Sequence, residues 1–217
     1  MHSLSKSNKT RIIRDIIAGA RLYEKFLVPY DFLIVTNDGK YNEVRFNKGD
    51  FAHLVGVRSH LNDLDFYKNF IKGTIAENNI KNQQRYDFGT IRKKIMRITK
   101  INKIVYANAQ TNLVLVNLHT KTRDFPLAIE STNDKMVVAF TGKDLHARSL
   151  RNNNQTNADE KKNILAIFSK EKNSKSKYSN CVYLKNYKVL KSICCDLEEK
   201  VSVKIFNDLD KNKTTQI

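Results

Sequence analysis

One short stretch of the chain, residues 50–58, carries a histidine, a turn glycine and an arginine within six positions. Phe51, Leu54 and Val55 fall at i, i+3 and i+4 and would lie on one face of a single helical turn. His53 falls off that face, which leaves its imidazole free to point elsewhere. An imidazole titrates near neutral pH, so an accessible one can act as an acid or a base. The pattern indicates a candidate catalytic His53, and the alternative is an ordinary half-exposed helix residue.

Several local signals predict the elements that position this stretch. Asp50 is a favourable N-cap for the turn and Gly56 a favourable residue just past its end. Upstream, residues 31–36 and 41–46 flank Asn-Asp-Gly at 37–39, which predicts a β-hairpin. Downstream, a helix is predicted to begin at residue 62 or 63 and to end at Gly73.

The remaining pattern predicts two more helices and then a sheet. A stripe of isoleucines predicts a helix over 10–26, and a basic helix is expected over 87–105. Apolar runs predict strands at 112–118, 125–129, 136–140 and 163–168. A short basic segment lies at 145–150, and polar loops are expected at 152–162 and 171–180. Residues 182–184 and 187–193 predict a further hairpin. Because helices precede strands, we expect an α+β fold in which the N-terminal helices and hairpin pack with a mostly antiparallel β-sheet.

No linker interrupts this pattern. We therefore expect a single domain over residues 10–195, preceded by a disordered tail at 1–9 and followed by a partly frayed C-terminal segment at 196–217.

Positive charge is the strongest compositional feature. The chain has 39 Lys and Arg against 22 Asp and Glu, a net charge of +17. A field of that sign attracts polyanions, so nucleic acid is the expected partner. The candidate phosphate-binding residues lie on the basic helix and in the later basic segment: Arg92, Lys93, Lys94, Arg97, Lys100, Arg148 and Arg151. The alternative is that the helix presents an ordinary solvated face.

Several classes of protein lose support. Cys181, Cys194 and Cys195 form neither a disulfide framework nor a zinc motif, which favours a reduced, cytoplasmic setting. The N-terminal residues lack the apolar core of a signal peptide, and no apolar run is long enough to span a membrane. There is no GxGxxG, Walker A, GxSxG or HExxH motif, and the acidic residues are scattered. We therefore expect no cofactor and no metal site.

RNA cleavage without a metal needs few groups. A base takes the proton of the 2′-hydroxyl, a cation stabilises the charge that develops on the phosphorus oxygens, and an acid protonates the 5′-oxygen. Histidine, lysine, arginine and tyrosine can supply all three roles. The reaction is confined to RNA because DNA lacks the 2′-hydroxyl.

Four segments carry a resemblance to a known family: Tyr23-Glu-Lys-Phe-Leu27, Phe32-Leu-Ile-Val35, Tyr41-Asn-Glu-Val-Arg-Phe46 and Phe51-Ala-His-Leu-Val-Gly-Val57. They resemble a phage-associated nuclease-like family in the group of barnase, EndoU, bacteriocin tRNases and RelE, whose signature is Phe-x-His-Leu-Thr-Gly-Val. Val55 stands here where the signature has Thr. Weaker similarity at residues 65–67, 135–140 and 163–170 extends the resemblance over roughly residues 15 to 190.

The resemblance implies a metal-independent RNase used as a toxin or in conflict between phage and host. Carried over by position, it makes His53 the acid or base and Arg58 a phosphate ligand. It makes Lys170 a weaker cationic candidate and Tyr178 a proton donor or stacking residue. The residues themselves favour the alternatives, in which Lys170 is solvated and Tyr178 packs in the protein.

Two functions remain open from the sequence. The first is an endoribonuclease that acts on tRNA or mRNA, held in check by an antitoxin. The second is a non-catalytic phage or mobile-element protein that binds nucleic acid or a host ribonucleoprotein, for example as an inhibitor of a defence complex.

Overall fold

We describe the fold from a computed structural model that covers residues 1–106, 112–154, 156–193 and 196–214. Within those ranges no helix combines the length and the apolar composition needed to cross a membrane. Cys181 is a free thiol, and Cys194 and Cys195 lie outside the described residues.

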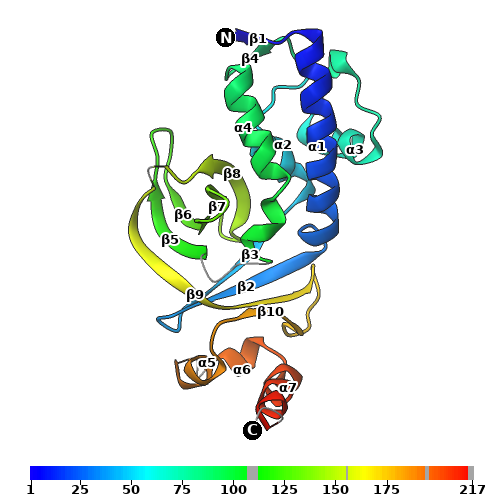
Figure 1. Ribbon diagram of the computed structural model, residues 1–217. Coiled ribbons are helices and arrows are strands. Elements are labelled where there is room, and N and C mark those ends of the chain that lie inside the picture. The colour runs from blue at the N-terminus through cyan, green and yellow to red at the C-terminus, as the bar shows by residue number, and fades with distance from the viewer. Residues whose placement is uncertain (107–111, 155, 194–195, 215–217) are drawn as a thin grey trace.

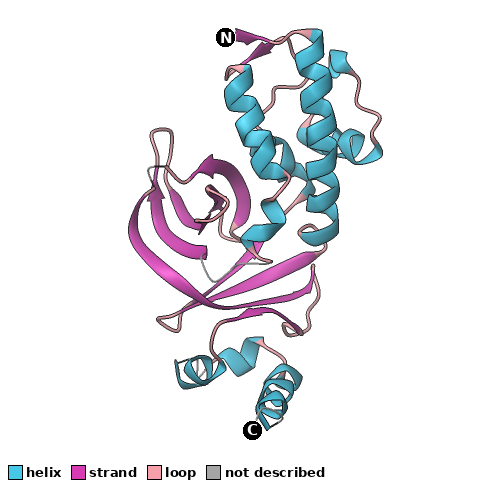
Figure 2. Cartoon of the chain, viewed as in Figure 1, coloured by secondary structure: helices cyan, strands magenta, loops and turns pink. Residues whose placement is uncertain are grey.

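Four helices gather at one end of the molecule (Figures 1 and 2). They are α1 (Lys6–Phe26), α2 (Phe51–Val55), α3 (Asp63–Lys72) and α4 (Phe88–Ile98), accompanied by 3₁₀ turns at Lys48–Asp50, Glu77–Asn79 and Ile101–Ile104. Polar caps fix where three of them begin. Ser5, Asn62 and Asp87 each accept a hydrogen bond from the backbone N–H three residues ahead.

The strands form a sheet that closes into a barrel. They are β2 (Tyr30–Thr36), β3 (Tyr41–Arg45), β5 (Asn112–His119), β6 (Phe125–Ser131), β7 (Met136–Thr141), β8 (His146–Asn152), β9 (Asn157–Glu171) and β10 (Asn180–Leu184), while β1 (His2–Ser3) pairs separately with β4 (Gln83–Gln84). The long strand β9 closes the barrel because its first half pairs with β5 and its second half with β2. Strands β3 and β8 run parallel and share one pair, Arg45 with His146.

The α+β class is confirmed, and the sheet adds one feature that was not predicted. The sheet is mostly antiparallel, as predicted, with β3–β8 as its parallel pair among the described strands, but it was not expected to close into a barrel with order β9-β2-β3-β8-β7-β6-β5-β9. Residues 157–162, predicted as loop, are the part of β9 that completes it. Their side chains are polar apart from Ala158 and mostly exposed, so the hydrophobic pattern gave no strand signal. Pairing with a distant strand determined the structure instead.

The strand β2 separates two hydrophobic clusters. Phe32 and Ile34 point to the side where α1–α4 and the barrel interior form the main core, and Leu33 and Val35 point to the other side. The second side is covered by α5 (Tyr187–Ile193), α6 (Leu197–Lys200) and α7 (Val203–Thr214), which lie beyond β9 and β10 (Figure 1).

The hairpin predicted from 182–184 and 187–193 is therefore wrong in its second half. Asn186 caps a helix by accepting a hydrogen bond from the backbone of Val189. Tyr187 and Leu190, spaced i and i+3, are the buried residues of that helix. At the other end of the chain, residues 1–9, which we expected to form a disordered tail, contain β1 and the first turn of α1.

Candidate functional site

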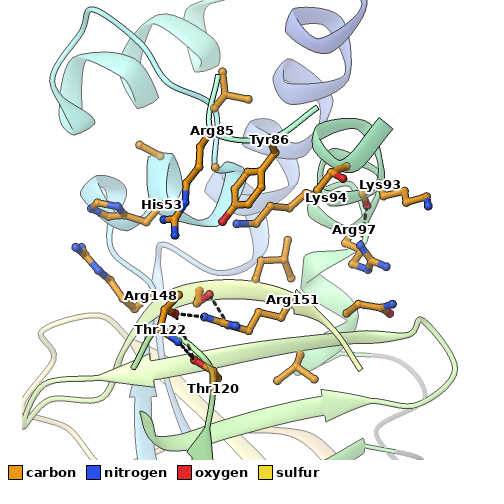
Figure 3. Close-up of a pocket in the computed structure, with 18 of the residues that line it drawn as sticks. His53, Arg85, Tyr86, Lys93, Lys94, Arg97, Thr120, Thr122, Arg148 and Arg151 are labelled. Atoms are coloured by element: carbon orange, nitrogen blue, oxygen red, sulfur yellow. Dashed lines mark hydrogen bonds between the residues drawn. The ribbon is translucent and has the colours of Figure 1, made fainter. Parts of the chain in front are cut away.

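A cleft of about 1360 Å³ lies between the helical end of the molecule and the barrel. One wall is formed by α2, α4 and the segment before α4, and the other by β8 and the β5–β6 turn (Figure 3). Basic side chains line both walls: Arg58, Arg85, Lys93, Lys94, Arg97, Lys121, Arg148 and Arg151.

The charge of this cleft is strongly one-sided. Among the described residues that line it, eight are Lys or Arg, and Asp63 is the one carboxylate. Cations facing one another across a cleft raise the local concentration of anions. The geometry suits a phosphodiester chain that is contacted from both sides.

His53 reaches the cleft because of how α2 is buried. Phe51 and Leu54 are fully buried in the main core, whereas the His53 side chain is 34% exposed. Its Nε2 atom lies 3.0 Å from Asp63 Oδ2 at the first turn of α3. A carboxylate oxygen only accepts hydrogen bonds, so Nε2 carries the proton and a neutral ring keeps its lone pair on Nδ1.

The surroundings of His53 favour its neutral form. Partial burial lowers the pKa of the imidazole, and the nearby Arg148 guanidinium lowers it further, against the opposing effect of Asp63. An imidazole that is neutral and oriented by a carboxylate is equipped to accept a proton.

Asp50 precedes α2 as predicted, but its side chain does not cap the helix. Its two oxygens bond elsewhere: Oδ1 lies 2.9 Å from His146 Nδ1, and Oδ2 accepts from the backbone N–H of Asn47. His146 begins β8, the strand that also carries Arg148. The Asp50–His146 contact thus fixes one wall of the cleft against the other.

Gly56 ends α2 with a φ of 71°, as the sequence predicted for this position. A Cβ atom placed there would lie 2.8 Å from the Lys94 Nζ atom. Glycine therefore allows the left-handed backbone and also leaves room for the Lys94 ammonium against α2.

Arg85 and Tyr86 were missed by sequence reasoning, because they precede the basic helix predicted over 87–105 and belong to no predicted element. Both side chains point into the cleft (Figure 3), and they directly follow the fully buried Gln84. The Gln84 amide accepts from the backbone N–H of Arg58 and donates to the carbonyls of Arg58 and Lys81. The sequence signal that could have identified them is a basic residue next to an aromatic one, Arg85-Tyr86, directly before the N-cap Asp87 of the basic helix.

Most of the predicted phosphate-binding residues meet in the cleft. Lys93, Lys94 and Arg97 come from α4, while Arg148 and Arg151 come from β8, and Arg58 also lines it. Two predicted residues lie elsewhere. Arg92 is on a different face of α4, and Lys100, beyond the end of α4, forms an ion pair with Asp134. The helix ends at Ile98, so its predicted continuation to 105 is replaced by a 3₁₀ turn.

Lys170 and Tyr178 are not brought together with His53. Tyr178 is 1% exposed in the second hydrophobic cluster, and its hydroxyl donates to Glu43. The Lys170 ammonium lies 4.8 Å from the centre of the Tyr178 ring. Burial and the Glu43 carboxylate raise the pKa of the Tyr178 hydroxyl above its ordinary value. This pair stabilises the C-terminal packing and lines no part of the cleft.

His119 is a second histidine on the cleft wall. Its Nε2 lies 2.9 Å from Asp159 and its Nδ1 3.3 Å from Asp124. Hydrogen bonds to Asp159 and then Asp124 raise the pKa of the imidazole. Both ring nitrogens are thus engaged by carboxylates.

Val55, which departs from the signature, is fully buried in the main core. The side chain at this position packs inside the protein and does not face the cleft. Among the described residues, no group of three or more His, Cys, Asp and Glu side chains forms a candidate metal site.

Comparison with known proteins identifies the family of the chain. No curated protein and no solved structure matches the chain. A family model described as phage-Barnase-EndoU-ColicinE5/D-RelE like nuclease4 matches residues 15–187, a range that contains His53 and both walls of the cleft. The chain therefore belongs to this family of phage-associated, barnase-, EndoU-, colicin- and RelE-like nucleases.

Proposed function

We propose that this protein is a metal-independent endoribonuclease in which His53 is the general base. The observation that carries the proposal is an imidazole held by Asp63 and facing Arg148 in a cleft lined by basic side chains. Family membership supports nuclease activity, and the side chains of the cleft support RNA as the substrate.

The proposed first step is proton transfer from the 2′-hydroxyl to Nδ1 of His53. The 2′-oxygen then attacks the adjacent phosphorus, and negative charge develops on the phosphorus oxygens. Arg148, whose charge acts on His53, comes from the opposite wall (Figure 3) and is placed to stabilise that charge. The products would be a 2′,3′-cyclic phosphate and a 5′-hydroxyl.

Metal independence follows in this proposal from the electrostatics of the cleft. Eight basic side chains against one carboxylate, among the described lining residues, repel divalent cations. They also perform the task that a metal performs in other nucleases, which is to neutralise the phosphate in the transition state.

A free RNase of this charge would damage the cell that makes it. We therefore propose a cytoplasmic toxin or an effector in phage–host conflict, with tRNA or mRNA as substrate. An acidic antitoxin that covers the basic cleft is the partner whose charge fits best.

The proposal predicts discrete fragments when the purified protein is incubated with total RNA in excess EDTA. DNA of matching sequence should stay intact because it lacks the 2′-hydroxyl. Gel analysis with a Mg²⁺ arm checks the result. Cleavage that needs Mg²⁺ contradicts the metal-independent mechanism. RNA binding that weakens steeply with salt, with no product in any arm, supports a non-catalytic binding protein instead.

The pH profile gives a second prediction, because His53 must be neutral to act as a base. The pKa of His53 is lowered from 6.5, so the rate should rise with pH and reach half of its maximum below that value. Replacing Arg148 by methionine removes one cause of the lowered pKa. We therefore expect the Arg148→Met profile to rise at higher pH, in addition to a lower maximum rate. If the cleavage rate of Arg148→Met rises over the same pH range as that of the wild type, the result contradicts the assigned role of His53.

A further inference from the structure

Lys94 occupies an unusual position for a lysine. Its ammonium rests against Gly56, at the end of the helix that carries His53, and lies 5.9 Å from the centre of the Tyr86 ring. Lys94 and Tyr86 enter the cleft from the same wall, which also carries His53 (Figure 3).

The charges around Lys94 are all of its own sign. Partial burial lowers its pKa to about 8, and the guanidinium groups of Arg151, Arg85 and Arg97 contribute to the shift. Among the described residues no carboxylate pairs with its ammonium. A lysine in such an environment releases a proton readily at neutral pH, unlike the ordinary surface lysine.

Building on the function proposed above, we propose that Lys94 is the general acid, which gives an ammonium proton to the 5′-oxygen of the departing nucleotide. The 2′-oxygen forms its bond to phosphorus as the bond from phosphorus to the 5′-oxygen breaks. The 2′-hydroxyl proton goes to His53, and the Lys94 proton completes the new 5′-hydroxyl. Exchange with water then removes the proton from His53 and returns one to Lys94.

The other basic groups of the cleft fit this role less well. The arginines keep their protons at any working pH and can only stabilise charge. Lys93, one position before Lys94 on α4, is exposed. Both ring nitrogens of His119 face carboxylates, Nε2 that of Asp159 and Nδ1 that of Asp124, which leaves neither free for a leaving oxygen.

The test compares two short RNA substrates that differ in one atom. In the second, sulfur replaces the 5′-bridging oxygen, and a thiolate departs without a proton because thiols are far more acidic than alcohols. We expect Lys94→Met to slow cleavage of the oxygen substrate roughly 10²- to 10⁴-fold. The sulfur substrate should be cut within a few-fold of the wild-type rate.

Lys94→Arg separates proton donation from charge, since it keeps the charge and cannot donate. It should show the same selective loss on the oxygen substrate. Lys93→Met is the matched control and should slow both substrates equally and modestly. In the wild type, cleavage of the oxygen substrate should decline as pH rises past about 8, and cleavage of the sulfur substrate should not.

Equal losses on both substrates in Lys94→Met, or full activity in Lys94→Arg, would show that Lys94 acts only through its charge and overturn the inference. That result leaves the proposed function standing, because the wild type still cuts RNA. A wild-type protein that cuts neither substrate removes the proposed function and this inference with it.

Discussion

Replacing His53 by alanine is expected to slow RNA cleavage roughly 10²- to 10⁴-fold, the usual contribution of a general base. The fold should persist because the side chain is 34% exposed and contributes little to the core. Cleavage rates in EDTA, together with a thermal unfolding curve, measure both parts of the expectation. The acidic limb of the pH profile should also disappear, since no imidazole remains to be deprotonated.

His60→Ala is the control for this experiment. His60 is exposed, is seven positions further along the chain and does not line the cleft. It should cleave RNA at the wild-type rate. If His53→Ala also cleaves at that rate, the assignment of the base is wrong, whatever the cleft binds.

Replacing Phe51 by alanine is expected to lower the free energy of unfolding by about 3–5 kcal/mol. Phe51 is fully buried, and its ring centre lies 5.2 Å from that of Tyr23, 5.5 Å from that of Tyr67 and 6.4 Å from that of Phe66. The cavity left behind would sit directly beneath α2. A loss of this size removes a large part of the 5–15 kcal/mol that stabilises a typical domain.

Denaturant unfolding at neutral pH measures that change. Leu64→Ala provides the comparison, because Leu64 is 43% exposed on α3. This substitution should lower the free energy of unfolding by well under about 1 kcal/mol. If Phe51→Ala lowers the free energy of unfolding as little as Leu64→Ala does, the aromatic core does not anchor α2.

The elements around His53 could be predicted from the sequence because their signals are local. The turn at 37–39 determines the hairpin, and Gly39 and Gly56 both adopt positive φ. The i, i+3, i+4 spacing of Phe51, Leu54 and Val55 was enough to identify the buried face of α2 and the exposed position of His53.

The opposite wall of the cleft could not be predicted in the same way. Arg148 and Arg151 meet the helices because the barrel closes, and closure depends on a polar segment of β9 pairing with β5 across a long sequence separation. The alternation of apolar residues along a strand does not indicate which distant strand it pairs with.

The same limit explains why Lys170 and Tyr178, the two catalytic candidates other than His53 and Arg58, lie away from the cleft. Lys170 and Tyr178 lie in and beyond β9, whose second half pairs with β2. The two faces of the sheet are separate environments, so a residue in or after β9 can lie on the face away from the cleft. The burial of Tyr178 against the C-terminal helices was hidden because residues 187–193 were predicted to be a strand, whereas they form α5.

The ends of the cleaved RNA test the central claim most directly. A synthetic RNA that contains one cleavable site should be cut in EDTA to give a 2′,3′-cyclic phosphate and a 5′-hydroxyl, and a single 2′-deoxy substitution at that site should abolish the cut. Mass spectrometry of the fragments identifies these ends. Fragments with a 5′-phosphate, or cleavage that survives the 2′-deoxy substitution, would contradict a mechanism in which His53 activates the 2′-hydroxyl.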